Sequence, residues 1–201
     1  MRLILCSQFN DCADKVAPYL QDKVQHALCI TTAANPYAPE KRDWQMREMD
    51  AVRNLRIELE CLDLAITTPA EIQQKLANHT AVYMTGGNTF YLLEQIYRSG
   101  FREAFSAWWD DEKTYIGCSA GAVVACPRID YIAPMDDPSQ ADLTDFTGLG
   151  LCPMLIVPHA DNAKYGKIGQ EIMVKHPASE GYLTLNDDQV WIADLASQRV
   201  L

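Results

Sequence analysis

The sequence predicts an α/β fold, a three-layer sandwich in which a mostly parallel sheet lies between two layers of helices. Short apolar runs alternate with amphipathic stretches along the chain, and these stretches are long enough to form helices. The composition is that of an ordinary globular protein, with 48% hydrophobic and 22% charged residues. Because a chain of 201 residues can bury one full core, we expect a single α/β domain over residues 1–201.

Buried strands are predicted where short apolar runs are bounded by polar or turn-forming residues. In chain order these runs are Leu3 to Cys6, Ala27 to Thr31, Ile57 to Leu64, Ala81 to Met84, Thr114 to Cys118 and Met154 to Val157. Helices are predicted in the amphipathic stretches Ala13 to Gln25, Asp43 to Arg56, Ala70 to Ala77, Thr89 to Ser99, Arg102 to Glu112, Ala120 to Ala125 and Ala163 to Lys175. Thr68-Pro69 and Asn88 are typical of helix amino-terminal caps.

Strands joined by helices form βαβ units, which place an active site at the carboxyl ends of the strands. Residues 34–39 and 127–150 interrupt the alternation and are predicted to form long loops. Near the end of the chain, Tyr182 to Leu185 and Val190 to Ala193 flank a sequence typical of a tight turn. We expect these two runs to form a hairpin at the edge of the sheet.

Charge and cysteine content restrict the partners and the compartment. The net charge of −10, with no run of Lys or Arg, would repel nucleic acid and anionic membranes. The seven cysteines are scattered, without the spacing of a zinc site, and we expect reduced, buried thiols. No window approaches the roughly 18 apolar residues of a membrane span, and no signal peptide is evident. These features predict a cytoplasmic protein. Nothing in the sequence requires a metal, and we expect a monomer or a homodimer without a cofactor.

The most informative motif is the G-x-S-x-G spacing around Ser119, where a predicted strand meets a predicted helix. Glycines on either side let the neighbouring backbone pass closely while the serine oxygen is exposed above the sheet, as a nucleophile requires. Small residues at such a turn also serve close packing, so the pattern alone leaves a structural interpretation equally open. Cys118 should point into the sheet, which makes thiol chemistry the weaker alternative.

A second glycine cluster, Gly86-Gly87-Asn88, follows another strand and opens the next helix. Backbone N–H groups at such a helix start are unpaired and can stabilise the charge that develops on a tetrahedral intermediate. The N–H groups of Gly87 and Ala120 are therefore a candidate oxyanion hole. A plain turn with an asparagine cap explains the cluster equally well.

A serine nucleophile needs a base, and four histidines are available: His26, His79, His159 and His176. His26 and His79 precede strands and belong to the opposite end of the sheet, while His176 follows a helix. His159 follows the apolar run ending at residue 157, so it should lie at the same end of the sheet as Ser119. His159 is therefore the predicted base.

The base in turn needs a carboxylate to hold its tautomer and to stabilise its charged form. Local patterns do not choose among the candidates, because aspartates in turns also form purely local hydrogen bonds. These candidates are Asp136, Asp137, Asp161, Asp187 and Asp188.

With these motifs in place, the chain resembles the peptidase family of dipeptidase E and cyanophycinase over most of its length. The resemblance rests on four blocks in the family's order: Gly86-Gly87-Asn88-Thr89, Gly117-Cys118-Ser119-Ala120-Gly121-Ala122, Gly148-Leu149-Gly150-Leu151 with Pro158-His159, and Leu185-Asn186-Asp187-Asp188-Gln189. It implies a class I glutamine amidotransferase-like (flavodoxin-like) fold and cofactor-free hydrolysis of an amide bond near a peptide terminus.

The resemblance also implies roles for particular residues. Ser119 would be the nucleophile, His159 the base and Asp187 the acid, although relatives often carry Glu there and the register leaves Asp188 as a second choice. Candidates for binding or supporting the substrate are Asn88, Asp136, Asp137 and Asp188.

The implied substrate is a small peptide, with an N-terminal aspartate preferred by dipeptidase E. Such a preference calls for a cation near the site, and the stretch after His159 offers Lys164 and Lys167 but no arginine. Lysine is a point charge rather than a bidentate fork, which leaves α-aspartyl specificity open. Two alternatives are an amidase or esterase for a non-peptide substrate, and a catalytically silent ligand-binding relative.

Overall fold

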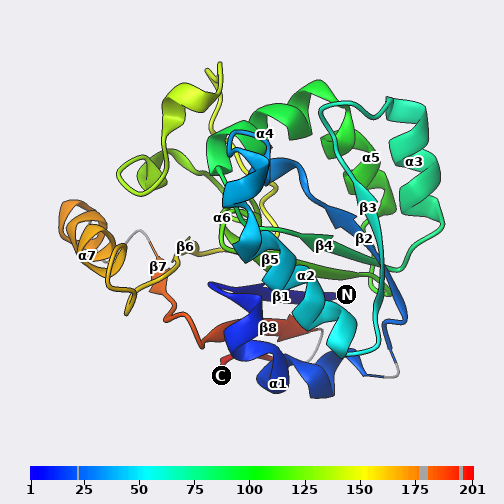
Figure 1. Ribbon diagram of the computed structural model, residues 1–201, viewed down its shortest axis with the longest axis horizontal. Helices are drawn as coiled ribbons and strands as arrows, with labels where there is room; N and C mark the ends of the chain where they lie inside the picture. The colour runs from blue at the N-terminus through cyan, green and yellow to red at the C-terminus, as the bar shows by residue number, and fades with distance from the viewer. Residues whose placement is uncertain (22, 177–180, 195–196) are drawn as a thin grey trace.

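The computed structural model describes residues 1–21, 23–176, 181–194 and 197–201. Within them, a seven-stranded sheet has the order β3-β2-β4-β5-β1-β8-β9 (Figure 1). The first five strands in this order are mutually parallel, and β8 and β9 extend the sheet in antiparallel fashion. Their bounds are β1 Arg2–Cys6, β2 His26–Ile30, β3 Glu58–Leu62, β4 Ala81–Met84, β5 Thr114–Cys118, β8 Val190–Asp194 and β9 Gln198–Val200.

Helices cover both faces of this sheet (Figure 1). Helix α1, Phe9–Leu20, follows β1, and helix α2, Asp43–Asn54, lies between β2 and β3. Both pack on one face. The other face carries α3 Pro69–Ala77, α4 Thr89–Arg98, α5 Phe101–Trp108 and α6 Ala120–Val124. The predicted α/β sandwich with a mostly parallel sheet is confirmed.

Side-chain alternation along the strands divides the core into two clusters. Leu3 and Leu5 face α3 to α6, whereas Ile4 and Cys6 between them face α1 and α2. This two-residue period follows from the pleat, and burial of both faces explains why the strands are continuously apolar in sequence.

The predicted positions of the elements agree with the structure apart from their ends. The first helix begins at Phe9 rather than Ala13 because its buried stripe starts with Phe9 and Cys12. The Thr68 cap is complete: its side chain accepts a hydrogen bond from the Glu71 N–H, and the Glu71 side chain accepts one from the Thr68 N–H. Asn88 likewise accepts a hydrogen bond from the Tyr91 N–H at the start of α4.

The hairpin predicted near the end of the chain is wrong. β7, at Tyr182–Thr184, pairs in parallel with β6, at Leu155–Val157, in a separate two-stranded sheet. β8 instead pairs with β1, and β9 lies at the edge. The strand predicted at Met154 to Val157 therefore exists, but it does not belong to the main sheet.

The segment from 127 to 150 forms a long excursion with two short 3-10 helices, Asp130–Ile132 and Pro138–Gln140. Together with α7, at Gly166–Lys175, and the small β6-β7 sheet, it stands to one side of the main sheet (Figure 1). Six cysteines are buried as expected, but Cys61 is exposed. No helix of the described segments is long and apolar enough to cross a membrane.

Candidate active site

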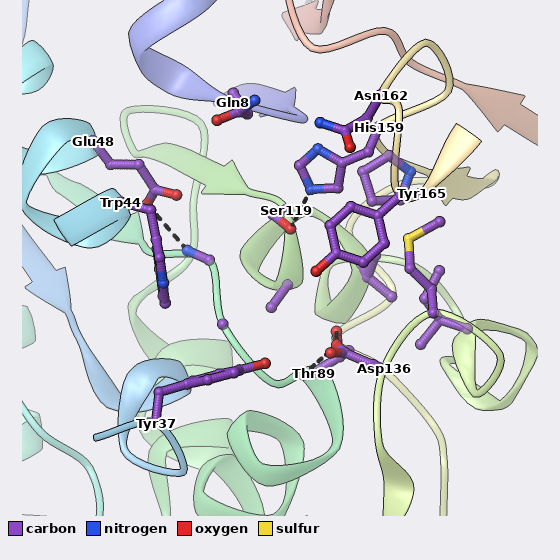
Figure 2. A pocket seen from close by; sticks show the side chains of 17 residues that line it. Gln8, Tyr37, Trp44, Glu48, Thr89, Ser119, Asp136, His159, Asn162 and Tyr165 are labelled. Atoms are coloured by element: carbon purple, nitrogen blue, oxygen red, sulfur yellow. Dashed lines mark hydrogen bonds between the residues drawn. The ribbon is translucent and has the colours of Figure 1, made fainter. Parts of the chain in front are cut away.

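The residues that follow several strands meet around one pocket. Gln8 follows β1, Gly86 and Gly87 follow β4, and Ser119 follows β5, while His159 comes from beyond β6 (Figure 2). The pocket has a volume of about 250 Å³. Its position at the carboxyl ends of the parallel strands is the one that α/β sheets provide for ligands.

Ser119 lies at a strained turn between β5 and α6. Its backbone angles are φ 49° and ψ −109°, a conformation that side-chain-bearing residues rarely adopt. Two glycines make the turn fit: a Cβ atom at Gly117 would lie 2.4 Å from the Gly121 carbonyl oxygen, and one at Gly121 would lie 2.2 Å from the Met84 carbonyl oxygen. The glycines of the motif therefore meet a packing requirement that brings the serine to the pocket.

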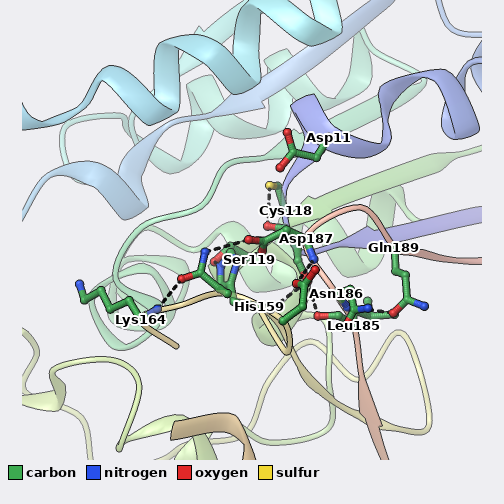
Figure 3. Close-up of polar contacts among 12 residues, drawn as sticks. Asp11, Cys118, Ser119, His159, Lys164, Leu185, Asn186, Asp187 and Gln189 are labelled. Carbon is green, nitrogen blue, oxygen red and sulfur yellow. Dashed lines mark hydrogen bonds and ion pairs between the residues drawn. The ribbon is translucent and has the colours of Figure 1, made fainter. Parts of the chain in front are cut away.

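Ser119, His159 and Asp187 form one hydrogen-bonded chain. Ser119 Oγ lies 2.9 Å from His159 Nε2, and His159 Nδ1 lies 2.5 Å from Asp187 Oδ1 (Figure 3). The other carboxylate oxygen of Asp187 accepts a hydrogen bond from Asn162 Nδ2 at 2.8 Å. The histidine and aspartate side chains are only 12% and 16% exposed, so water competes weakly for these bonds.

The charge on Asp187 fixes the histidine tautomer. Burial disfavours the carboxylate, but hydrogen bonds from His159 and Asn162 more than offset this cost and lower the pKa of Asp187 to about 2. With the carboxylate ionised at neutral pH, Nδ1 of His159 carries the proton of the neutral ring and donates a hydrogen bond to Asp187. Nε2 is then free to accept a hydrogen bond from the Ser119 hydroxyl.

The backbone around His159 is held from two sides. His159 has φ 62°, which is uncommon for a side-chain-bearing residue. Its N–H donates to Ser7 Oγ at 3.0 Å, and the Ser7 hydroxyl donates to the Leu185 carbonyl at 2.9 Å. Ser7, directly after β1, thus ties the histidine loop to the segment that carries Asp187.

The other candidate aspartates of this region lie apart from the histidine ring. Asp188 accepts a hydrogen bond from Lys15 Nζ at 3.0 Å on the surface. Asp161 accepts one from the backbone N–H of Asp187 at 2.8 Å and so supports the turn. The structure therefore places the Asp187 carboxylate, and not that of Asp188, against the His159 ring.

Two further predicted donors line the same pocket. Ala120 is the first residue of α6, where a backbone N–H has no partner within the helix. Gly87 has φ 138°, and a Cβ atom there would lie 2.2 Å from the Ala33 carbonyl oxygen. The neighbouring Gly86 N–H donates to Glu48 Oε2 at 3.2 Å. Gly87 and Ala120 thus line the same pocket as Ser119.

Of the remaining predicted site residues, Asp136 lines the pocket, whereas Asn88 and Asp137 do not. The Asp136 carboxylate accepts hydrogen bonds from the Thr89 N–H at 2.8 Å and hydroxyl at 2.5 Å. Asn88 caps α4 and donates to the Asp137 carbonyl at 2.9 Å. Asp137 is turned toward its own 3-10 helix and accepts hydrogen bonds from Ser139 and Gln140. Asn88 and Asp137 thus hold the loop that presents Asp136.

The two lysines suggested for an acidic substrate do not line the pocket. Lys164 Nζ donates to the Tyr165 hydroxyl at 2.9 Å and lies 4.5 Å from the centre of that ring. Lys167 is exposed on α7.

Sequence reasoning missed a group of pocket residues on and before α2. Glu48 comes from the buried face of this helix, alongside Gln45, Met49 and Val52. Two aromatic side chains, Tyr37 and Trp44, form another part of the wall (Figure 2). The available signal was a carboxylate at helical spacing with apolar residues, a pattern that predicts burial.

Glu48 is an unusual carboxyl group because only 5% of the residue is exposed. Burial raises its pKa from 4.5 to about 7, although the hydrogen bond from the Gly86 N–H favours the charged form. Asp136 shows the same tendency: burial raises its pKa, and the bonds from Thr89 offset part of the effect. Burial therefore disfavours the ionised form of both carboxyl groups in the pocket.

Known sequences that are similar to this chain include peptidases. The model of peptidase family S51 matches residues 3–199. An uncharacterized peptidase of Pasteurella multocida is 38% identical over 177 residues, which cover 86% of this chain and 83% of the relative. Peptidase E of Nostoc sp. is 27% identical over 190 residues, which cover 93% and 76% of the two chains.

Solved structures share the same architecture. One of them is the crystal structure of a protein from Listeria monocytogenes that carries the name peptidase E. It superimposes with a TM-score of 0.89 at 28% identity, and the match covers 100% of this chain and 97% of the Listeria chain. A peptidase from an actinobacterium has a TM-score of 0.71 at 16% identity, covers 100% of this chain and 86% of its own, and is similar in fold.

Proposed function

This chain belongs to peptidase family S51 and is a serine peptidase, and we propose that Ser119, His159 and Asp187 hydrolyse small peptides at the amino terminus, as in a dipeptidase. The observation that carries the proposal is the continuous chain of hydrogen bonds from Ser119 Oγ through the imidazole to Asp187. This arrangement matches the geometry that activates a serine in acyl transfer.

In the first half of the reaction, Ser119 Oγ attacks the carbonyl carbon of the first peptide bond while His159 Nε2 takes the hydroxyl proton. Asp187 stabilises the resulting imidazolium. The carbonyl oxygen becomes an oxyanion facing the N–H groups of Gly87 and Ala120. As the C–N bond breaks, His159 returns the proton to the leaving amine, and an ester to Ser119 remains.

In the second half, His159 removes a proton from water, and the hydroxide attacks the ester carbonyl. Collapse of the second oxyanion breaks the bond to Ser119 Oγ, which recovers its proton from His159. The free carboxylic acid then leaves.

Pocket size and charge support a short substrate with a free amino terminus. A volume of about 250 Å³ lies below the roughly 300–1,000 Å³ of pockets for drug-sized ligands. The Asp136 carboxyl faces this space and can accept hydrogen bonds from an α-ammonium group. We assign that role to Asp136, with Asn88 and Asp137 holding its loop.

Hydrolysis of matched peptides tests the proposal. The native protein should cleave neutral dipeptides such as Leu-Leu and should lose at least about a hundredfold in kcat/KM when the amine is acetylated, because the ammonium contact is removed. Ser119→Ala should abolish cleavage. Asp136→Asn should raise KM for free dipeptides more than it lowers kcat.

Equal hydrolysis of acetylated and free peptides would contradict amino-terminal recognition. Turnover confined to simple esters or non-peptide amides would replace the peptidase assignment at this site by an esterase or amidase activity. Ligand binding without any turnover would favour a silent binding relative.

A further inference from the structure

The described residues lining the pocket include carboxyl groups but no lysine or arginine. Besides the tyrosines, their ionisable side chains are Glu48, Asp136 and His159. Arg42 is held near the pocket by hydrogen bonds to the backbone carbonyls of Tyr37 and Asn35. An acidic side chain entering this space would face carboxyl groups and no cation, whereas a basic one could pair with these carboxyl groups.

Glu48 lies close to the nucleophile. A Cβ atom placed on Gly86 would be 3.0 Å from Glu48 Oε1 and 3.2 Å from Ser119 Cβ. Glu48 Oε1 and Ser119 Cβ therefore lie on either side of the space that a Gly86 side chain would occupy. In the proposed reaction, the first residue of the peptide is bonded to Ser119 through its carbonyl carbon. Its side chain is then within reach of Glu48.

Two aromatic rings complete this side of the pocket. Tyr37 and Trp44 meet edge to face with their ring centres 6.0 Å apart, and both line the pocket together with Glu48 (Figure 2). Aromatic surfaces bind the methylene stem of a lysine or arginine, and ring faces attract the charge at its end. An apolar wall beside a buried carboxyl group has the composition expected of a site for a long basic side chain.

We infer that Glu48, Trp44 and Tyr37 form a subsite for a basic side chain on the first residue of the substrate, with Glu48 as the specificity-determining residue. This inference rests on the proposed peptidase function of the site. Asp136 would bind the α-ammonium group while Glu48 binds the side-chain cation. An approaching cation also favours the charged carboxylate over the protonated form that burial stabilises.

Three dipeptides that differ only in the first residue test the subsite: Lys-Leu, norleucyl-leucine and Asp-Leu. Lysine and norleucine share an unbranched stem, so their ratio of kcat/KM reports the terminal charge. We expect Lys-Leu to be preferred over norleucyl-leucine by at least about tenfold, the scale of one charge-assisted hydrogen bond, and Asp-Leu to be the poorest substrate. Glu48→Gln should reduce the first ratio to within about twofold.

Asp50→Asn is the matched control, because Asp50 lies on the same helix but is exposed and paired with Arg53 at 2.9 Å. This variant should keep the native ratio. A purely structural role of Glu48 would lower kcat/KM for Lys-Leu and norleucyl-leucine equally, and that result would overturn the inference. Preferred hydrolysis of Asp-Leu would overturn it as well.

Calorimetric binding of the same dipeptides to the Ser119→Ala protein separates this inference from the proposed function. The Ser119→Ala protein should bind Lys-Leu more tightly than norleucyl-leucine, and adding Glu48→Gln should remove this difference in affinity. This result supports the subsite even if the native protein hydrolyses neither peptide. Equal affinities, or no binding of Lys-Leu, would overturn the subsite even if the native protein is an active dipeptidase.

Discussion

Single residues of the site have backbone conformations or surroundings that raise the free energy of the folded protein. Ser119 and His159 occupy backbone conformations with positive φ, and Glu48 is a carboxyl group withdrawn from water. The sequence predicted the first two because motif spacing and strand ends restrict a nucleophile and its base. It did not predict the place of Glu48 in the pocket, since the helical spacing indicates burial but only the fold shows what the buried helix face meets.

The choice between Asp187 and Asp188 illustrates the same limit. Both residues lie in one polar turn, and local spacing does not reveal which side chain turns inward. In the folded chain, Asp187 meets His159 while Asp188 pairs with Lys15. Both partners are remote in sequence, since His159 lies after β6 and Lys15 lies on α1.

Glu48 predicts a pH dependence of stability. Its pKa is about 7 in the folded state and 4.5 as the unperturbed value. The folded protein therefore binds more protons than the unfolded chain between these values, so this group lowers stability as pH rises from about 4.5 to 7. Glu48→Gln keeps an acceptor for the Gly86 N–H and removes the titration. Its stability relative to the native protein should rise between pH 5 and pH 8, by on the order of 3 kcal/mol at most.

Urea unfolding of both proteins at several pH values measures this difference. A stability difference between Glu48→Gln and the native protein that stays constant from pH 5 to pH 8 would contradict the assigned environment of Glu48.

At the scale of elements, short apolar runs predicted the strands of the parallel sheet and the order of the helices. Pairing partners could not be predicted in the same way. The polar residues from Asn186 to Gln189 have the composition of a hairpin turn, yet β8 pairs with β1, and β7 pairs with β6. A β7-β8 hairpin and the observed pairings would both bury apolar strands. The local sequence does not show that β1 and β6 are the competing partners.

The turn that carries Ser119 depends on the close approach of α6 to β4, which a substitution at Gly121 would prevent. Gly121→Ala would place a Cβ atom 2.2 Å from the Met84 carbonyl oxygen, and backbone on both sides restricts relief of the clash. We expect a loss of stability of about 1–3 kcal/mol or more and a loss of activity that exceeds the fraction unfolded. Thermal unfolding and dipeptide hydrolysis measure the two effects.

Gly169→Ala in α7 serves as the control, because its Cβ atom would contact only side-chain atoms, at 3.3 Å from Val157 Cγ1. This change should affect stability and activity less than Gly121→Ala. A fully active Gly121→Ala protein would show that the close approach of α6 to β4 is not needed to position the nucleophile.

At the scale of the whole molecule, two core clusters support a site assembled from distant parts of the chain. Ser7, Gly87, Ser119, His159 and Asp187 converge because the parallel strands end at one edge and the β6-β7 sheet stands beside it. The seven cysteines report on the integrity of these cores, since six are buried and only Cys61 is exposed.

Thiol accessibility follows from this distribution. A hydrogen bond from Cys29 lowers the pKa of Cys61 to about 6, so a substantial fraction of this thiol is charged at neutral pH. A disulfide reagent should modify one thiol rapidly in the native protein and all seven in denaturant, and Cys61→Ser should remove the rapid phase. Rapid modification of several thiols in the native state would contradict the packing of both cores.

If Asp187 activates Ser119 through His159, the three residues together set the rate at which a fluorophosphonate serine probe modifies Ser119. Intact-mass measurements should show one adduct on the native protein and none on Ser119→Ala. Asp187→Asn should slow labelling by about 10²–10⁴-fold, because the histidine loses the partner that holds its tautomer. The adjacent Asp188→Asn should label at the native rate within about twofold. Labelling of Ser119→Ala, or an equal loss in the two aspartate variants, would show that Asp187 does not activate Ser119.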